Sequence, residues 1–473
     1  MVVQPLGFRS FRVDAEQGFF LNEKYLDLHG VNRHQDLLGR GWAMSSDDEQ
    51  RDFSLIAEIG ATAVRLAHYQ HNQHVYDLTD KLGFVVWAEI PNIDSVNATP
   101  SYMATTQKQL LELIRQNYNH PSIAFWSVGN ELGARAGPDP TEMVQLLIAL
   151  AKAEDPSRLT AIATMSGIDG VAVRSTADAI GYNIYLGWYG GSHSDLADYI
   201  DGLHRSVSGR PLCVSEYGAG ASVRQHQSLP SQPIPGGPFH PEEWQSFFHE
   251  TYWKSMKTRK YLCGKFVWNM FDFASDSRNE GDTPGQNDKG LVTYDRVTRK
   301  DAFYWYKANW SAQPTVHITQ RRYNPRPGGN IAARVYSNLS RIELKVNGVS
   351  QVSRRATIIF FPSTLRFPQK PRRSSRPAVT LRPAAYAMLS VGLPCRSILG
   401  PGTWNMGAVP LLCRRESRTR SVLAEDPLLA RANHHAAKYF RYRTAASNAD
   451  IFVLKSDGAQ LLGLQTGSAI AIA

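Results

Sequence analysis

Short apolar runs alternate with longer amphipathic stretches between residues 24 and 273. The apolar runs are rich in Val, Ile and aromatic residues, which is typical of buried parallel strands, and the stretches between them have helical spacing. This pattern predicts strands at 24–32, 61–69, 84–91, 123–131, 159–165, 179–188, 211–219 and 264–273, and helices at 45–59, 102–117 and 141–153. Eight βα units of this length predict an α/β fold, a (β/α)8 TIM barrel over residues 21–312.

The pattern changes beyond residue 312. Apolar and polar residues alternate over 317–320 and 332–336, and Asn347-Gly348 is a turn signal. Residues 313–352 are therefore expected to form the opening strands of a β-sandwich.

Residues 353–473 do not continue that pattern. Between 353 and 415 there is no Asp or Glu, and Arg, Pro and Ser recur without a period. We interpret this tail either as a disordered basic segment or as the product of a change of reading frame shortly after Val352.

The net charge of +10 is concentrated in the same tail. Residues 353–473 carry 18 basic and 5 acidic side chains, so the rest of the chain is slightly acidic. Nucleic-acid binding is therefore not expected of the barrel. No apolar run is long enough to span a membrane, and the start lacks the apolar segment of a signal peptide, which favours a cytoplasmic location. A periplasmic or secreted location stays open if an N-terminal signal was lost.

Four cysteines, Cys213, Cys263, Cys395 and Cys413, occur without a close CxxC pair. This spacing indicates neither a disulfide framework nor a zinc site, so we expect reduced thiols.

Polar residues follow the apolar runs at the ends of the predicted strands. They are Arg33, His34, His68, Glu89, Asn130, Glu131, Tyr185, Glu216, Asn269 and Asp272. Because the carboxyl ends of barrel strands meet at one face, we expect an active site there.

Two glutamates at that face suggest glycoside hydrolysis. Hydrolysis with retention needs one neutral and one ionised carboxyl about 5–5.5 Å apart. Glu131 ends the fourth predicted strand and Glu216 the seventh, across the barrel mouth from each other. Their environments must separate their pKa values, and either Tyr185 or Tyr217 could donate a hydrogen bond to one of them.

The sequence resembles glycoside hydrolase family 2, which contains β-galactosidases, β-glucuronidases and β-mannosidases. The similar stretches are 30–36 (GVNRHQD), 64–69 (VRLAHY), 119–123 (NHPSI), 129–131 (GNE), 215–218 (SEYG) and 266–269 (FVWN). The resemblance covers roughly residues 5 to 350.

This resemblance implies roles for individual residues. Glu131 would be the proton donor and Glu216 the nucleophile, with Tyr185 beside the nucleophile. Asn130 would hold the 2-hydroxyl of the sugar. The further substrate-binding residues implied are Arg65, His68 and Trp268.

The substrate implied is less specific than the family. The region from 264 to 310 looks most like the β-galactosidase branch, so we expect a retaining enzyme acting on terminal β-galactosides. The alternative is a β-glucuronidase, because Asn287 and Lys289 resemble the Asn-x-Lys pair that holds the sugar carboxylate in those enzymes. An inactive carbohydrate-binding fragment is the alternative from another class.

The sequence also departs from the family pattern. Of the β-sandwich domains that normally precede the barrel, only the last strand of an immunoglobulin-like domain is expected, within residues 1–20. The sandwich begun at 313–352 would be immunoglobulin-like too. Residues that help hold magnesium in a bacterial relative have no clear match around 87–94, so we predict no metal and no cofactor. An oligomer stays open.

Overall fold

A computed structural model describes residues 7–97, 99–165, 170–326 and 330–346, and beyond residue 348 only strands at 349–355, 360–366, 379–383, 438–443, 450–456, 459–466 and 469–472. The chain divides into two compact units, Met1–Met388 and Leu389–Ala473. The first unit contains the barrel and every side chain discussed below.

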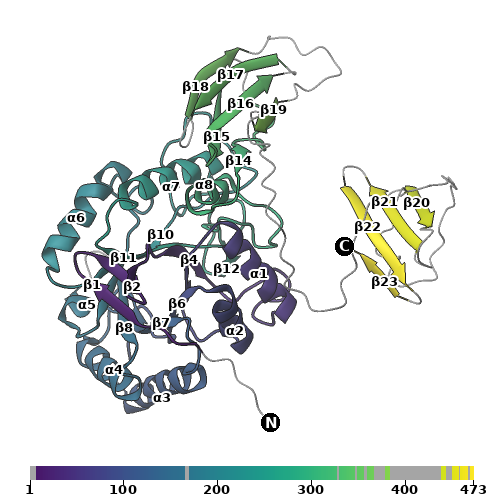
Figure 1. Ribbon diagram of the computed structural model, residues 1–473. Helices are drawn as coiled ribbons and strands as arrows, with labels where there is room; N and C mark the ends of the chain where they lie inside the picture. The colour runs from purple at the N-terminus through teal and green to yellow at the C-terminus, as the bar shows by residue number, and fades with distance from the viewer. Residues whose placement is uncertain are drawn as a thin grey trace. The chain divides into compact units, whose positions relative to one another are not determined.

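Eight parallel strands close into a barrel in the order β10-β11-β4-β5-β6-β7-β8-β9 (Figure 1). They are β4 (His29–Arg33), β5 (Ala63–Leu66), β6 (Val85–Glu89), β7 (Ile123–Asn130), β8 (Leu159–Met165), β9 (Ala179–Asn183), β10 (Leu212–Tyr217) and β11 (Leu262–Val267). The predicted TIM barrel is confirmed, and each predicted strand overlaps one of these strands.

Helices surround this barrel. They are α1 (Ser46–Glu58), α2 (Gln73–Leu82), α3 (Pro100–Asn117), α4 (Thr141–Glu154), α5 (Gly170–Arg174), α6 (Leu196–Ser206), α7 (Glu242–Met256) and α8 (Asp301–Trp310). The three predicted helices correspond to α1, α3 and α4. A capping box opens α1, because Ser45 accepts the N–H of Asp48 and Asp48 accepts the N–H of Ser45. None of the described helices combines the length and apolar character that a membrane crossing requires.

Helix α7 was not predicted, and its burial explains why. Most of its residues are buried, including charged ones such as Glu242 and Glu250. Arg322 pairs with Glu242, and Arg334 of β15 (Asn330–Ser337) donates to Glu250 at 2.9 Å. A helix covered on its outer side has no solvent-facing polar stripe, so its sequence lacks an amphipathic period.

The end of the barrel formed by the strand starts is filled by apolar side chains. Trp87, Phe125 and Phe266 pack there with small residues from neighbouring strands. Phe19 joins them from the antiparallel sheet of β1 (Phe11–Asp14), β2 (Gly18–Leu21) and β3 (Lys24–Tyr25). This end of the barrel is therefore packed and covered by the small sheet.

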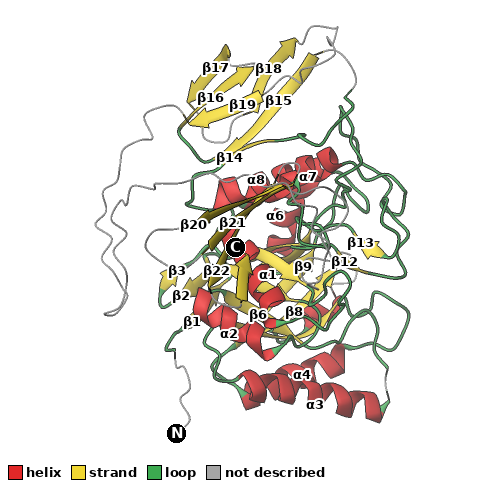
Figure 2. Ribbon diagram, turned by 90° about the vertical axis from the view of Figure 1, so that its right-hand side faces the viewer, coloured by secondary structure: helices red, strands yellow, loops and turns green. Residues whose placement is uncertain are grey.

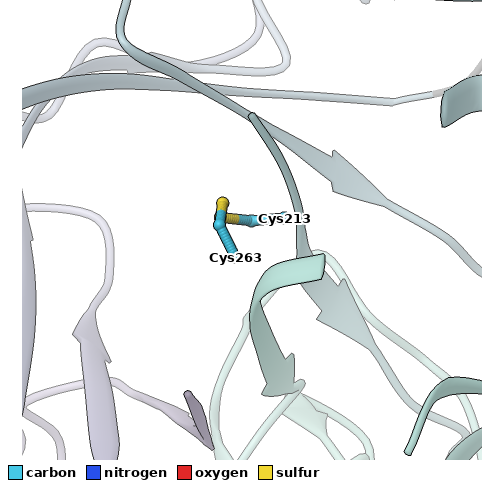
Figure 3. The surroundings of a disulfide bond; sticks show 2 residues. All are labelled: Cys213 and Cys263. Atoms are coloured by element: carbon cyan, nitrogen blue, oxygen red, sulfur yellow. A yellow bond between two sulfur atoms is a disulfide. The ribbon is translucent and has the colours of Figure 1, made fainter. Parts of the chain in front are cut away.

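A disulfide joins Cys213 of β10 to Cys263 of β11 inside the barrel (Figure 3). Their Cα atoms are 4.9 Å apart because the two strands pair with Leu212 opposite Leu262. Our expectation of reduced thiols is therefore wrong for this pair. The separation of 50 residues hid it, since only the barrel makes β10 and β11 neighbours. Cys395 and Cys413 lie outside the described residues.

Antiparallel strands follow the barrel. One sheet contains β14 (Val316–Ile318), β15 and β18 (Phe360–Arg366); another contains β16 (Arg341–Val346), β17 (Val349–Arg355) and β19 (Val379–Pro383); a third contains β20 (Lys438–Arg443), β21 (Asp450–Ser456), β22 (Ala459–Thr466) and β23 (Ala469–Ile472). Figure 2 shows β14 and β15 beside α7 and α8.

The expected domain boundaries at 20, 312 and 352 stay predictions. So does the reading-frame hypothesis, because much of 353–473 and the Asn347-Gly348 turn lie outside the described residues.

Asp52 of α1 ties this helix to the barrel. Its fully buried carboxylate accepts hydrogen bonds from Arg33, at the end of β4, at 3.0 Å and from Arg296 at 2.9 Å. Arg33 was expected at the barrel mouth, but its guanidinium is committed to this buried pair. Two buried cations therefore share one anion.

We predict that Asp52→Ala lowers the free energy of unfolding by about 3–5 kcal/mol, because it leaves both guanidinium groups buried without their anion. Urea unfolding measures the change. Asp47→Ala, an exposed aspartate on the same helix, is the matched control and should shift stability by less than about 0.5 kcal/mol. Equal effects of the two variants would contradict the anchoring role of Asp52.

Candidate active site

A cavity of 830 Å³ opens at the carboxyl ends of the barrel strands. Of the residues proposed from the sequence, those that line it are His68, Asn130, Glu131, Tyr185, Glu216, Trp268 and Asn287. Arg65 and Lys289 do not line it. The strand-end pattern therefore located the cavity, although some of its members, such as Asp272, lie outside it and pair with other side chains.

Glu216 lies near the end of β10 and is 5% exposed. Arg65 donates to its Oε1 at 2.7 Å, and the Tyr185 hydroxyl donates to its Oε2 at 2.7 Å. Burial and the adjacent carboxylate raise the pKa of Tyr185 well above its ordinary value, so this hydroxyl keeps its proton. One full positive charge and two donors stabilise an ionised carboxylate at this position.

Tyr185 is thus the tyrosine that serves Glu216. Tyr217, the other candidate, is fully buried and its hydroxyl accepts a hydrogen bond from Tyr306 at 3.2 Å. Tyr217 cannot reach Glu216 because side chains alternate along β10. The Glu216 side chain faces the cavity, and the Tyr217 side chain points toward the helices.

Glu131 has a different environment. It follows β7 with a φ of 53°, a left-handed conformation that is uncommon for a residue other than glycine. Burial, and then the negative charge of Glu216, raise the pKa of Glu131 to about 7, although the amide of Asn183 donates to its Oε1 at 2.8 Å. At neutral pH this carboxyl can both give and take a proton.

Arg65 is fully buried and connects Glu216 to Glu89 and Asn130. Besides Glu216, it donates to both oxygens of Glu89 at 3.1 Å, to Asn32 Oδ1 at 2.9 Å and to Asn130 Oδ1 at 2.8 Å. Burial disfavours its charge, but the carboxylates of Glu89 and Glu216 outweigh burial and raise its pKa. The guanidinium of Arg65 thus contacts these buried side chains and does not itself line the cavity.

His68 and Trp268 form one wall of the cavity. Their rings stack with centroids 5.0 Å apart, and His68 Nδ1 lies 2.6 Å from Glu89 Oε1. The other ring nitrogen, Nε2, lies 3.9 Å from Glu216 Oε1. Glu89 thereby orients the imidazole so that Nε2 is beside Glu216.

Asn130 and Asn183 are the last residues of β7 and β9, and both line the cavity. Arg65 and Asn183 both donate to Asn130 Oδ1, the second at 3.2 Å, which directs the Asn130 amide nitrogen away from them. Sequence reasoning missed Asn183. Its position could have identified it, because Asn183 is the last residue of β9 just as Asn130 is the last residue of β7.

Asn287 contributes to the cavity lining, and Lys289 follows it two residues later in the sequence. Asn287, in β13 (Gln286–Asn287), lines the cavity and its Oδ1 accepts the N–H of Lys289 at 3.1 Å. Lys289 is fully buried, and its Nζ makes no hydrogen bond within the described residues. It lies 5.2 Å from the ring centre of Trp188 and 5.1 Å from that of Tyr189, which stabilise a cation.

The arrangement supports acid–base and nucleophilic chemistry on one bound group. Glu131 and Glu216 come from strands on different sides of the ring, one with a raised pKa and one held by donors. Two carboxyl groups with unlike environments facing one cavity are what a glycosidase requires.

Similarity to known proteins also indicates a glycosidase. The profile of "Glycosyl hydrolases family 2, TIM barrel domain" matches residues 11–313. A β-glucuronidase of Bacteroides fragilis is 45% identical over 357 residues, which are 74% of this chain and 51% of the relative. The chain therefore spans about half the length of the curated relatives it matches.

Two solved structures are similar to this chain. A putative β-galactosidase from Bacteroides fragilis has a TM-score of 0.70 at 38% identity and covers 76% of this chain and 53% of its own. Bacteroides uniformis β-glucuronidase 2, covalently bound to cyclophellitol-6-carboxylate aziridine, has a TM-score of 0.71 at 31% identity and covers 80% and 48%.

These relatives support the glucuronidase alternative better than the galactosidase that the sequence favoured, while both belong to one enzyme class. The family match spans all eight strands of the barrel that carries Glu131 and Glu216. The chain belongs to glycoside hydrolase family 2 and carries its TIM-barrel domain.

Proposed function

We propose that this chain is a retaining β-glucuronidase, in which Glu216 is the nucleophile and Glu131 the acid and base. The observation that carries the choice of sugar is the buried ammonium of Lys289, which has no hydrogen-bond partner within the described residues, while the backbone N–H of Lys289 donates to the cavity-lining Asn287. The carboxylate oxygen of Glu280 lies 3.8 Å from this ammonium, too far for a hydrogen bond, and the carboxylate of a glucuronide supplies an anion that can make one. A galactoside has no charge to offer it.

The reaction proceeds by double displacement. Glu216 attacks the anomeric carbon while Glu131 protonates the leaving oxygen, and a covalent glycosyl-enzyme forms. Glu131, now ionised, then takes a proton from water, which attacks the same carbon and releases the sugar. The relative solved with a covalently bound carboxylate aziridine supports a covalent step at this kind of site.

The other cavity residues orient the sugar. Asn130 presents its amide nitrogen, since its oxygen is occupied by Arg65 and Asn183, and this suits a hydroxyl next to the reacting carbon. His68 and Trp268 bind the terminal sugar at their wall. Arg65 acts through Glu216 and Asn130 as a positioning residue.

Purified protein should hydrolyse nitrophenyl β-glucuronide in preference to nitrophenyl β-galactoside. Glu216→Gln should lower kcat by at least about 10³-fold, because the nucleophile is lost. Circular dichroism of each sample checks that it is folded. A preference for the galactoside would contradict the role of Lys289, and a folded chain without activity would favour the inactive carbohydrate-binding alternative.

We expect kcat/KM to fall about tenfold per pH unit above pH 7, because the pKa of Glu131 is about 7 and the acid must be protonated. A pH–rate profile measures this. In Glu131→Gln the nitrophenolate leaves without protonation, so the residual activity should lose that alkaline limb. An identical limb in this variant would assign it to another group.

The same pKa predicts a cost in stability. The pKa of Glu131 is raised from 4.5 to about 7, so its protonated form stabilises the fold below pH 4.5 and this contribution is lost as pH rises through 7. Glu131→Gln should therefore be more stable than the unmodified protein by up to about 3 kcal/mol at pH 8 and much less at pH 5. Thermal unfolding at both pH values, with the exposed Glu112→Gln on α3 as control, measures it. A gain independent of pH would contradict the assignment.

A further inference from the structure

The loop between β12 (Phe273–Ala274) and β13 carries a second cation to the cavity wall. Arg278 lies in this loop and lines the cavity. Its backbone is fixed within the hairpin, because its N–H donates to Ser275 at 2.9 Å and its carbonyl accepts from Gly285 at 2.7 Å. Local structure therefore holds the backbone from which the Arg278 side chain extends.

The side chain of Arg278 is engaged at one edge only. Nη1 donates to Glu280 Oε1 at 2.8 Å, and Nη2 lies 3.4 Å from the Tyr189 hydroxyl. The side chain is 30% exposed, although it lines the cavity. A guanidinium has five donors in a planar fork, so donors remain for a further acceptor on the cavity side.

Glu280 also lies beside Lys289. The oxygen that accepts from Arg278 is 3.8 Å from Lys289 Nζ, too far for a hydrogen bond. One buried carboxylate therefore serves two cations, and it hydrogen-bonds to only one of them. The position of Glu280 shows that an oxygen anion fits between Arg278 and Lys289.

The neighbouring acids are already paired. Asp288 Oδ2 lies 2.6 Å from His240 Nδ1, and Asp272 accepts from Lys300 at 2.8 Å. Within the loop cluster of Arg278, Glu280 and Lys289, two cations share one carboxylate in a largely buried setting. A single anionic group entering from the cavity would balance the second cation.

We propose that Arg278 is a specificity-determining residue that binds the acid group of the sugar together with Lys289, and that Glu280 positions Arg278 for this contact. The inference rests on the proposed glucuronidase function and extends it. The ligand class is a glycoside with one carboxylate on the ring, and a neutral hydroxymethyl group in its place leaves the extra charge unmatched.

Binding of two hydrolysis-resistant ligands tests this without turnover. Calorimetry with the full chain gives the Kd of nitrophenyl β-thioglucuronide and of its neutral analogue, nitrophenyl β-thioglucoside. Arg278→Gln should weaken the acidic ligand roughly ten- to hundredfold, because a charge-assisted hydrogen bond is lost, and leave the neutral one unchanged. Lys289→Met should also weaken only the acidic ligand.

Arg224→Gln is the matched control. Arg224 pairs with Asp282 of the same loop at 2.7 Å and does not line the cavity, so its loss should change neither Kd. Arg278→Lys keeps the charge without the fork and should weaken the acidic ligand by a smaller factor. Thermal unfolding of each variant checks the fold.

Three other binding results would contradict the proposal, each in a different way. Weaker acid binding in Lys289→Met but not in Arg278→Gln would overturn the role of Arg278 and leave the proposed function standing. Equal weakening of both ligands by Arg278→Gln would reduce Arg278 to a structural residue. If the unmodified protein does not prefer the acidic ligand, the proposed function and this inference both fail.

Discussion

The buried guanidinium of Arg65 is the interaction on which the geometry of the site depends. A buried cation must be paired, and Arg65 of β5 has hydrogen-bond partners on four other barrel strands: Asn32 of β4, Glu89 of β6, Asn130 of β7 and Glu216 of β10. These hydrogen bonds hold the side chains of the four strands in place relative to one another. One buried guanidinium, which does not line the cavity, therefore positions both Glu216 and Asn130.

Two glutamates at one barrel mouth have opposite properties because their neighbours differ. Arg65 and Tyr185 both donate to Glu216, whereas Glu131 receives one amide donor and is otherwise desolvated beside a negative charge. The ionised carboxylate is therefore itself a cause of the raised pKa of its partner. Neither environment is useful for double displacement without the other.

Much of this could be predicted from the sequence. The barrel strands are short apolar runs with polar residues at their ends, so the cavity and its two glutamates were visible in the pattern. Asn183 and the Cys213–Cys263 disulfide were not, because both depend on which strands become neighbours. Helix α7 was missed since tertiary burial removes its amphipathic period, and Arg278 lies in a loop without any period.

The choice of sugar could not be made from local sequence for a related reason. A lysine two residues after an asparagine is equally compatible with a structural ion pair and with a binding site. What distinguishes the two is how completely the ammonium is satisfied by its own chain. Lys289 Nζ lies near two aromatic faces and 3.8 Å from a carboxylate oxygen of Glu280, and that oxygen hydrogen-bonds to Arg278 instead. The fold holds both cations close to the cavity and provides one carboxylate for them, and in the proposed glucuronidase the acid group of the substrate would complete the charge balance.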